Sequence, residues 1–244
     1  NTETIINDFI EKCIDKGTNI ESNITWKNMH YIWKLYLSQI EIPNMIYSQQ
    51  LQEILLSKLK HTIEGNNTMF NNVTSKYLPS VGSFLSFWDK YIIIVDEDTK
   101  CSDEYEIDEL ASLYKNSDTK VITLSDADIL KMISHYFSPQ VEIIDNKYIR
   151  NIRCSLWLKD SDIISFLNSY KADIINGIKN INSDIISLDD LYDAYKTWVK
   201  AVSIVEKRTH LIVSKQFFQL FVSNELKEFI QFEKFITFIW FQKN

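Results

Sequence analysis

One pattern recurs along this chain: an amphipathic helix, a spacer, and a second helix that a serine opens. Residues 24–37 align without a gap on residues 186–199. Each of these stretches is followed by a segment that begins with a serine, Ser48 in the first copy and Ser214 in the last. A shorter copy runs from Ile107 to Lys115 and continues to a serine at position 125. Repeated small helical modules of this kind indicate a protein that holds other molecules together.

Two of the copies are followed by residues expected to form strands. After the helix capped by Ser125, the runs 141–144 and 148–154 flank a turn-forming cluster, and 235–240 forms a β-branched and aromatic run in the last copy. A helix pair followed by a hairpin is the order of a winged helix. The first copy is expected to be only a helical relative, with a helix from Ser48 to Gly65 and a loop over 66–79.

The predicted fold class is therefore mainly α with small β-hairpins, arranged as tandem winged-helix-like modules. The polar, acidic segment 96–106 is the strongest linker candidate. A long helix that starts near Asp160 is expected to bridge the middle and last modules. The predicted modules are an N-terminal helical module, 1–95, a middle winged-helix-like module with this bridging helix, 105–180, and a C-terminal winged-helix-like module, 181–244.

Composition limits the cellular setting. No hydrophobic run approaches the length of a membrane span, and residues 1–16 lack the apolar centre of a signal peptide. The three cysteines are an odd number and show no CxxC spacing, which favours a reducing compartment over a disulfide framework or a zinc site. We therefore expect a soluble protein of the cytoplasm, without membrane contact.

The motifs of common enzymes are missing from this sequence. It has no GxxxxGK[ST] or GxGxxG phosphate loop, no GxSxG elbow and no HExxH pair, and its four histidines are dispersed. The acidic group around 96–109 lies mainly in the predicted linker, where a solvated loop explains it. We expect no catalytic residues, no metal and no cofactor.

Nucleic-acid binding would require a local basic patch, because 26 basic against 33 acidic residues give a net charge of −7. The candidate phosphate contacts precede and enter the second helix of the last module. They are Lys207, Arg208, His210 and Lys215. In the middle module Lys147, Arg150 and Arg153 fall on the expected wing, but its second helix begins with Asp126 and Asp128, which would repel phosphates.

The first helix of each long copy carries more aromatic side chains than one helix face can bury. Trp33, Tyr36, Tyr195 and Trp198 are therefore candidates for contact with a partner protein. The alternative is that these rings fill seams between modules.

The last quarter of the chain resembles the C-terminal winged-helix region of the D5-like primase-helicases of large DNA viruses and phages. The resemblance lies in a helix with the pattern LY..Y..W over 191–198, a spacer, and a helix with the pattern S...F from Ser214. The ATPase motifs of that family are absent, so the resemblance implies a non-motor module that contacts DNA or other replication proteins. The acidic and aromatic character of this version favours protein binding.

Together these features predict a non-enzymatic adaptor or accessory module of a viral nucleic-acid-processing complex, located in the host cytoplasm or a viral factory. Its partners would be proteins of a replication or gene-expression complex, with nucleic acid as a possible further ligand of the C-terminal module. The alternative is a purely protein-binding structural scaffold, for example in transcription or translation initiation.

Overall fold

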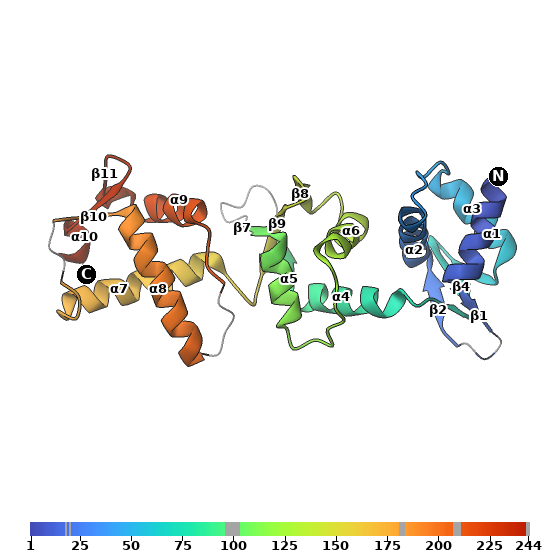
Figure 1. The fold of residues 1–244 in the computed structure, drawn as a ribbon, viewed down its shortest axis with the longest axis horizontal. Coiled ribbons are helices and arrows are strands. Elements are labelled where there is room, and N and C mark those ends of the chain that lie inside the picture. The colour runs from blue at the N-terminus through green and yellow to red at the C-terminus, as the bar shows by residue number, and fades with distance from the viewer. Residues whose placement is uncertain (18, 20, 96–102, 181–183, 207–210, 243–244) are drawn as a thin grey trace. The chain divides into compact units, whose positions relative to one another are not determined.

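The fold is known from a computed structural model that describes residues 1–244 except 18, 20, 96–102, 181–183, 207–210 and 243–244 (Figure 1). It is a mixed α/β structure, 56% helical and 18% strand, with small antiparallel sheets. Two compact units make up the chain. One combines Asn1–Lys90 with Glu104–Asn151, and the other combines Tyr91–Asp103 with Ile152–Asn244. Residues 104–151 thus belong with the N-terminal part and residues 152–180 with the C-terminal part, whereas the predicted modules 105–180 and 181–244 divide the chain at 180/181.

The same order of elements occurs three times: a leading helix, a short strand, two helices and a hairpin. In the first copy these elements are α1 (Thr2–Cys13), β2 (Asn23–Thr25), α2 (Trp26–Gln39), α3 (Ser48–Lys58), β3 (His61–Glu64) and β4 (Asn67–Asn71). The sheet order is β2-β4-β3, so the strand before the helix pair bonds to the last strand of the hairpin. Ile24 faces Phe70 in that antiparallel pairing, and both side chains are fully buried.

The second copy repeats this order, and its last strand β9 bonds to both β7 and β8. Its elements are α4 (Leu78–Tyr91), β7 (Asp103–Glu106), α5 (Ile107–Lys115), α6 (Asp126–Tyr136), β8 (Glu142–Ile144) and β9 (Tyr148–Cys154). A further strand, β6 (Ile92–Ile94), pairs with the end of β9. A small separate pairing joins β1 (Asp15–Lys16) to β5 (Val73–Thr74).

The third copy has the sheet order β10-β12-β11 and therefore the same connectivity as the first. Its elements are α7 (Lys159–Ile175), β10 (Ile185–Ser187), α8 (Leu188–Glu206), α9 (Lys215–Glu225), β11 (Ile230–Gln231) and β12 (Phe235–Thr237). A 3-10 turn, Lys227–Phe229, precedes the hairpin, and a short helix α10 (Ile239–Gln242) follows it. The expected terminal strand 235–240 is thus shorter than predicted.

Hydroxyl side chains begin the predicted helices as expected. The Oγ1 of Thr25 accepts a hydrogen bond from the backbone N–H of Asn28, and Ser125 and Ser214 cap α6 and α9 in the same way. Ser48 differs, because the capping position belongs to Tyr47 and no side chain caps α3. The serine-led pattern therefore marks where α3 begins without supplying its cap.

The expectation of a purely helical first copy is wrong. Helix α3 ends at Lys58, and the segment expected to continue it forms β3, which pairs with β4 inside the predicted loop 66–79. Gly65, at φ 59°, and Asn66 form the two-residue turn between the paired residues Glu64 and Asn67. Glycine at a positive φ is common both at helix C-termini and in hairpin turns, so Gly65 is compatible with the predicted helix end and with the observed turn.

A tyrosine hydroxyl fastens the helices in the second and third copies. Tyr195 on α8 donates to the Oδ2 of Asp162 on α7 over 2.8 Å and accepts from the backbone N–H of Val213 over 3.2 Å. Tyr114 on α5 occupies the same place: its hydroxyl lies 2.6 Å from the Oγ of Ser83 on α4 and accepts from the backbone N–H of Ile122. Each hydroxyl thus joins the leading helix, the first helix of the pair and the chain segment before the second helix.

Replacing Tyr195 with Phe keeps the ring but removes the hydroxyl, which is the only hydrogen-bond partner that the described residues give to the buried N–H of Val213. We expect Tyr195→Phe to lower the free energy of unfolding by about 1–3 kcal/mol. Tyr114→Phe should cost less, because the Oγ of Ser83 still accepts from the Ile122 N–H. Chemical denaturation measures both variants, with the exposed Tyr47→Phe as the control. Equal stability of Tyr195→Phe and Tyr47→Phe would contradict this account.

Candidate interaction surfaces

The predicted phosphate contacts lie at the start of α9. Lys207, Arg208 and His210 fall outside the described residues, and Lys215 is the first residue of the helix. The Nζ of Lys215 is 2.9 Å from the Oδ1 of Asp189 on α8, and this contact is the main reason why the pKa of that carboxyl is lowered. The charge of Lys215 is therefore balanced locally by an acidic neighbour.

The basic residues of the expected wing are balanced in the same manner. Lys147 lies 3.3 Å from a carboxylate oxygen of Glu106, and Arg150 is bonded to Glu104. In the other unit, Arg153 donates from one nitrogen to both carboxylate oxygens of Asp160 at 2.9 Å. These three cations form ion pairs with residues of this chain and do not make an unopposed basic surface.

Three of the four aromatic candidates are buried inside their own units. Trp33 is 1% exposed, Tyr36 3% and Tyr195 0%, whereas Trp198 is partly buried, with its ring centroid 5.8 Å from that of Phe166. The prediction that Trp33, Tyr36 and Tyr195 face a partner is therefore wrong.

These rings fit because α2 buries two faces instead of one. Trp33 and Tyr36 pack with Phe9 of α1 in the core of the first copy. On another face, Tyr31 contacts the rings of His135 and Tyr136 on α6. The alternative that aromatics fill seams between modules fits Tyr31, while Trp33 and Tyr36 lie within one module.

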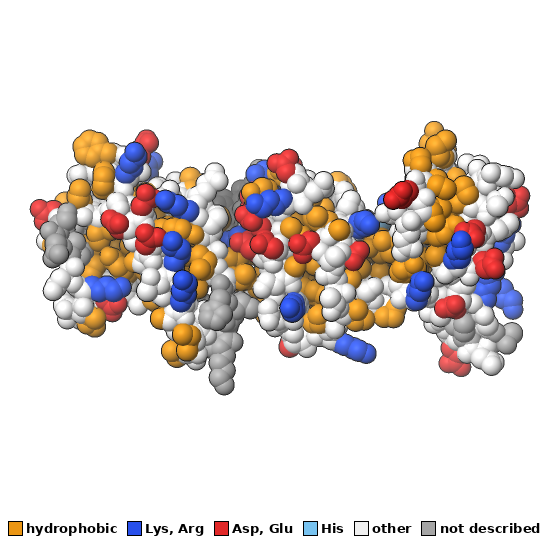
Figure 2. Space-filling model, in the orientation of Figure 1, with side chains coloured by type: hydrophobic (Ala, Val, Ile, Leu, Met, Phe, Trp, Pro, Cys, Tyr) orange, Lys and Arg blue, Asp and Glu red, His pale blue; other side chains and the backbone are white. Residues whose placement is uncertain are grey.

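Other large hydrophobic side chains are exposed that the sequence patterns did not single out. Met45 and Tyr47, in the spacer before α3, are 83% and 85% exposed, and Phe232, in the β11–β12 turn, is 85% exposed. Figure 2 shows hydrophobic surface at the segments that Figure 1 places around α3 and β11. Within 104–151 the structure exposes no large hydrophobic side chain to a comparable degree. The outer copies therefore present apolar side chains of a kind that residues 104–151 do not expose.

Helices α2 and α6 meet through a polar seam within the N-terminal unit. His135 of α6 lies 2.8 Å from the backbone oxygen of Lys27 through Nε2 and 3.2 Å from the Nζ of Lys34 through Nδ1. Because a carbonyl oxygen can only accept, Nε2 carries the proton, and Nδ1 accepts from the Lys34 ammonium. Tyr136 completes the seam by donating to the Oδ1 of Asn28 over 2.8 Å.

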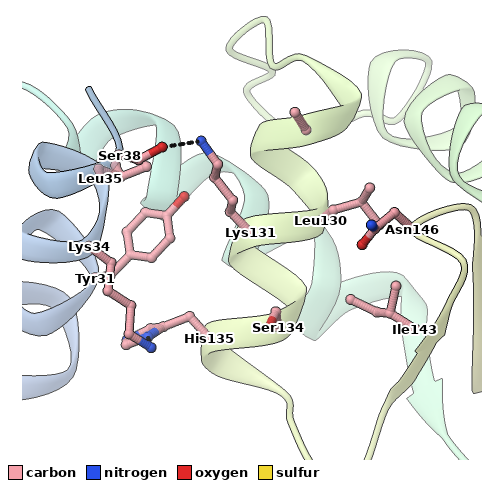
Figure 3. A pocket seen from close by; sticks show the side chains of 11 residues that line it. Tyr31, Lys34, Leu35, Ser38, Leu130, Lys131, Ser134, His135, Ile143 and Asn146 are labelled. Carbon is pink, nitrogen blue, oxygen red and sulfur yellow. Dashed lines mark hydrogen bonds between the residues drawn. The ribbon is translucent and has the colours of Figure 1, made fainter. Parts of the chain in front are cut away.

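Beside this seam, α2, α6 and the β8–β9 hairpin enclose a cleft of about 720 Å³ (Figure 3). Its lining residues are Tyr31, Lys34, Leu35, Ser38, Ala127, Leu130, Lys131, Ser134, His135, Ile143 and Asn146. Tyr31 is 2% exposed, its ring points from α2 toward α6, and its hydroxyl has no hydrogen-bond partner in the described structure. An unpaired buried hydroxyl costs roughly 1–3 kcal/mol, so this group needs an explanation.

The described residues contain no cluster of three or more His, Cys, Asp or Glu side chains that could hold a metal ion. No helix in the described part of the chain is long and apolar enough to cross a bilayer. Comparisons with protein-family models, curated proteins and solved structures found no match. The candidate surfaces must therefore be interpreted from their own geometry.

The seam predicts a pH dependence of stability. Burial lowers the pKa of His135 to about 4 from its ordinary value of 6.5. As the pH falls, the unfolded chain protonates this histidine at a higher pH than the folded protein does. The stability that neutral His135 contributes is therefore fully present above pH 6.5 and is lost as the pH falls toward 4. We expect this contribution to be on the order of 2 kcal/mol.

Urea denaturation from pH 7.5 to 4 measures this effect by comparing the protein with His135→Gln. The stability advantage of the parent protein should be largest above pH 6.5 and shrink toward pH 4. His61→Gln, at an exposed histidine of β3, is the matched control. A difference between parent and His135→Gln that stays constant across this range would contradict the prediction.

Proposed function

We propose that this chain is a non-enzymatic adaptor of a nucleic-acid-processing complex, built from three tandem winged-helix modules that bind protein partners. The observation that carries the proposal is the repeated topology. A leading helix, a strand, two helices and a hairpin, with the first strand bonded to the last, is the order expected of a winged helix. The resemblance of the last quarter to viral primase-helicases supports placing the adaptor in a replication assembly.

In a winged helix the second helix of the pair is the recognition helix that enters the DNA major groove. The corresponding helices here are α3, α6 and α9. Each contains one lysine and no arginine, and each contains at least one carboxylate. Lys58 of α3 lies 3.1 Å from Glu3, and Lys215 of α9 pairs with Asp189. Neutral or acidic recognition helices favour protein over phosphate as the ligand.

The recognition helix of the middle module is also occupied by its own chain. Its His135 and Tyr136 contact α2 of the first module, with Tyr136 donating to Asn28. Groove binding by α6 would require this seam to open. The middle module therefore supports the arrangement of the N-terminal unit, and the outer modules supply the exposed apolar side chains Met45, Tyr47 and Phe232 for partners.

A protein-binding role predicts weak binding to nucleic acid. At 50 mM salt, fluorescence anisotropy with a 20-base-pair duplex or a 20-nucleotide single strand should detect no binding tighter than about 10 µM. The contrary outcome is sub-micromolar binding that weakens with salt and disappears in the triple variant Lys207→Gln/Arg208→Gln/Lys215→Gln. That outcome would show that the C-terminal module contacts nucleic acid directly.

The exposed apolar side chains predict where partners bind. Benzoylphenylalanine in place of Tyr47 or Phe232 should give photo-crosslinks to protein in nuclease-treated extract of the source cells. The same probe at the exposed Glu11 of α1 serves as the control. Crosslinks from Glu11 equal to those from the apolar sites, or no protein adduct at either apolar site, would argue against the adaptor function.

A further inference from the structure

The cleft between α2 and α6 combines cationic groups with an apolar wall. Lys34 comes from α2 and Lys131 from α6, and no carboxylate lines the cleft. This composition is unusual for the chain, which has seven more acidic than basic residues. Leu35, Leu130 and Ile143 supply the apolar part of the lining.

Both lysines lack a carboxylate partner in the part of the chain that the structure describes. The Nζ of Lys34 lies 3.2 Å from the Nδ1 of His135, and the Nζ of Lys131 lies 3.3 Å from the Oγ of Ser38 (Figure 3). Both contacts are with neutral groups, so the positive charges stay unbalanced. Ion pairs hold Lys58 and Lys215 on the other two recognition helices, which sets Lys131 apart.

The buried hydroxyl of Tyr31 is an independent sign of a ligand. It belongs to the lining of the cleft and has no hydrogen-bond partner among the residues that the structure describes, although its side chain is almost wholly buried. Native structures rarely leave such a group unpaired. A ligand that displaces the Lys131 side chain from its contact with Ser38 could supply the missing partner.

We propose that the α2–α6 cleft is a docking site for a short acidic peptide segment of a partner protein. Carboxylates of the peptide pair with Lys34 and Lys131, and an aliphatic or aromatic side chain between them packs on Leu35, Leu130 and Ile143. This inference rests on the proposed adaptor function and names the chemistry of one of its partners.

The lining favours a peptide over a nucleic-acid strand. A phosphate backbone carries a charge at every step and would make no use of the apolar wall. Asp126 and Asp128 at the start of α6, and Asp145 beside the lining residue Asn146, repel every added negative charge, so they disfavour a strand with a charge at every step more than a peptide with two carboxylates. A peptide with two carboxylates and an apolar side chain between them satisfies both kinds of lining.

Selection from a random 12-residue peptide library displayed on phage tests the proposal on the full chain. Enriched peptides should contain two acidic residues that flank a Leu, Ile or Phe. Lys34→Gln/Lys131→Gln should weaken binding of an enriched peptide at least tenfold by fluorescence polarisation. Lys115→Gln/Lys120→Gln removes the same charge from exposed sites of the same unit and should change the affinity less than twofold.

Tyr31→Phe separates a ligand contact from a structural role. Since the hydroxyl has no partner in the free protein, its removal should leave thermal stability unchanged or raise it, while peptide affinity falls severalfold. Unchanged affinity together with lower stability would assign the hydroxyl to folding and count against the site.

Three outcomes would overturn the proposal: no enrichment, an enriched motif without acidic residues, or peptides that bind the Lys34→Gln/Lys131→Gln variant equally well. Tighter binding of a 12-nucleotide single strand through the same two lysines would assign the cleft to phosphate instead. Peptides that bind equally to the variant but are lost on changing Met45 or Phe232 would reject this cleft and leave the adaptor function intact.

Discussion

The buried tyrosine hydroxyl in the helix pairs of the second and third copies is the interaction on which this architecture depends most. In the third copy it ties α7, α8 and the segment before α9 through Asp162, Tyr195 and Val213. In the second copy Ser83, Tyr114 and Ile122 make the corresponding contacts. A polar group in a core is tolerated only when it is paired, so this hydroxyl fixes the leading helix and the second helix at once.

In the first copy a different side chain links the leading helix to the helix pair. Trp33 occupies the place of Tyr195, and its buried indole nitrogen has no partner in the described part of the chain. Tyr36, one turn later, donates to Asp8 of α1. The link between the leading helix and the helix pair is kept, although its position has moved. On another face of α2, Tyr31 contacts His135 and Tyr136 of α6.

Local signals in the sequence predicted the helix pairs well. Thr25, Ser125 and Ser214 cap helices as expected, and the runs around 145–147 form the predicted hairpin of the second copy. The hairpin of the first copy was missed because Gly65 fits a helix end as well as a turn. The burial of Trp33 and Tyr36 could not be predicted from α2 alone, because it depends on Phe9 of α1.

The charges of this molecule disfavour the DNA binding that its architecture would otherwise suggest. A helix that reads DNA needs free cations. Lys58 of α3 and Lys215 of α9 are instead neutralised by carboxylates of the same chain. Lys147 and Arg150 of the β8–β9 hairpin are neutralised in the same way. The unbalanced lysines of the α2–α6 cleft lie beside apolar side chains, in a setting that suits a peptide. Sequence patterns located the helix pairs, but only the contacts of each lysine in the structure distinguish a neutralised lysine from an available one.

The repeated connectivity is the central claim, and backbone NOEs of the deuterated full chain measure it most directly. The account predicts contacts of β12 with both β10 and β11, at Ile186–Ile236 and Ile230–Ile236, and the matching contacts of β4 at Ile24–Phe70 and Ile63–Thr68. A hairpin with no contact between Ile186 and Ile236, or between Ile24 and Phe70, would contradict the shared order of strands.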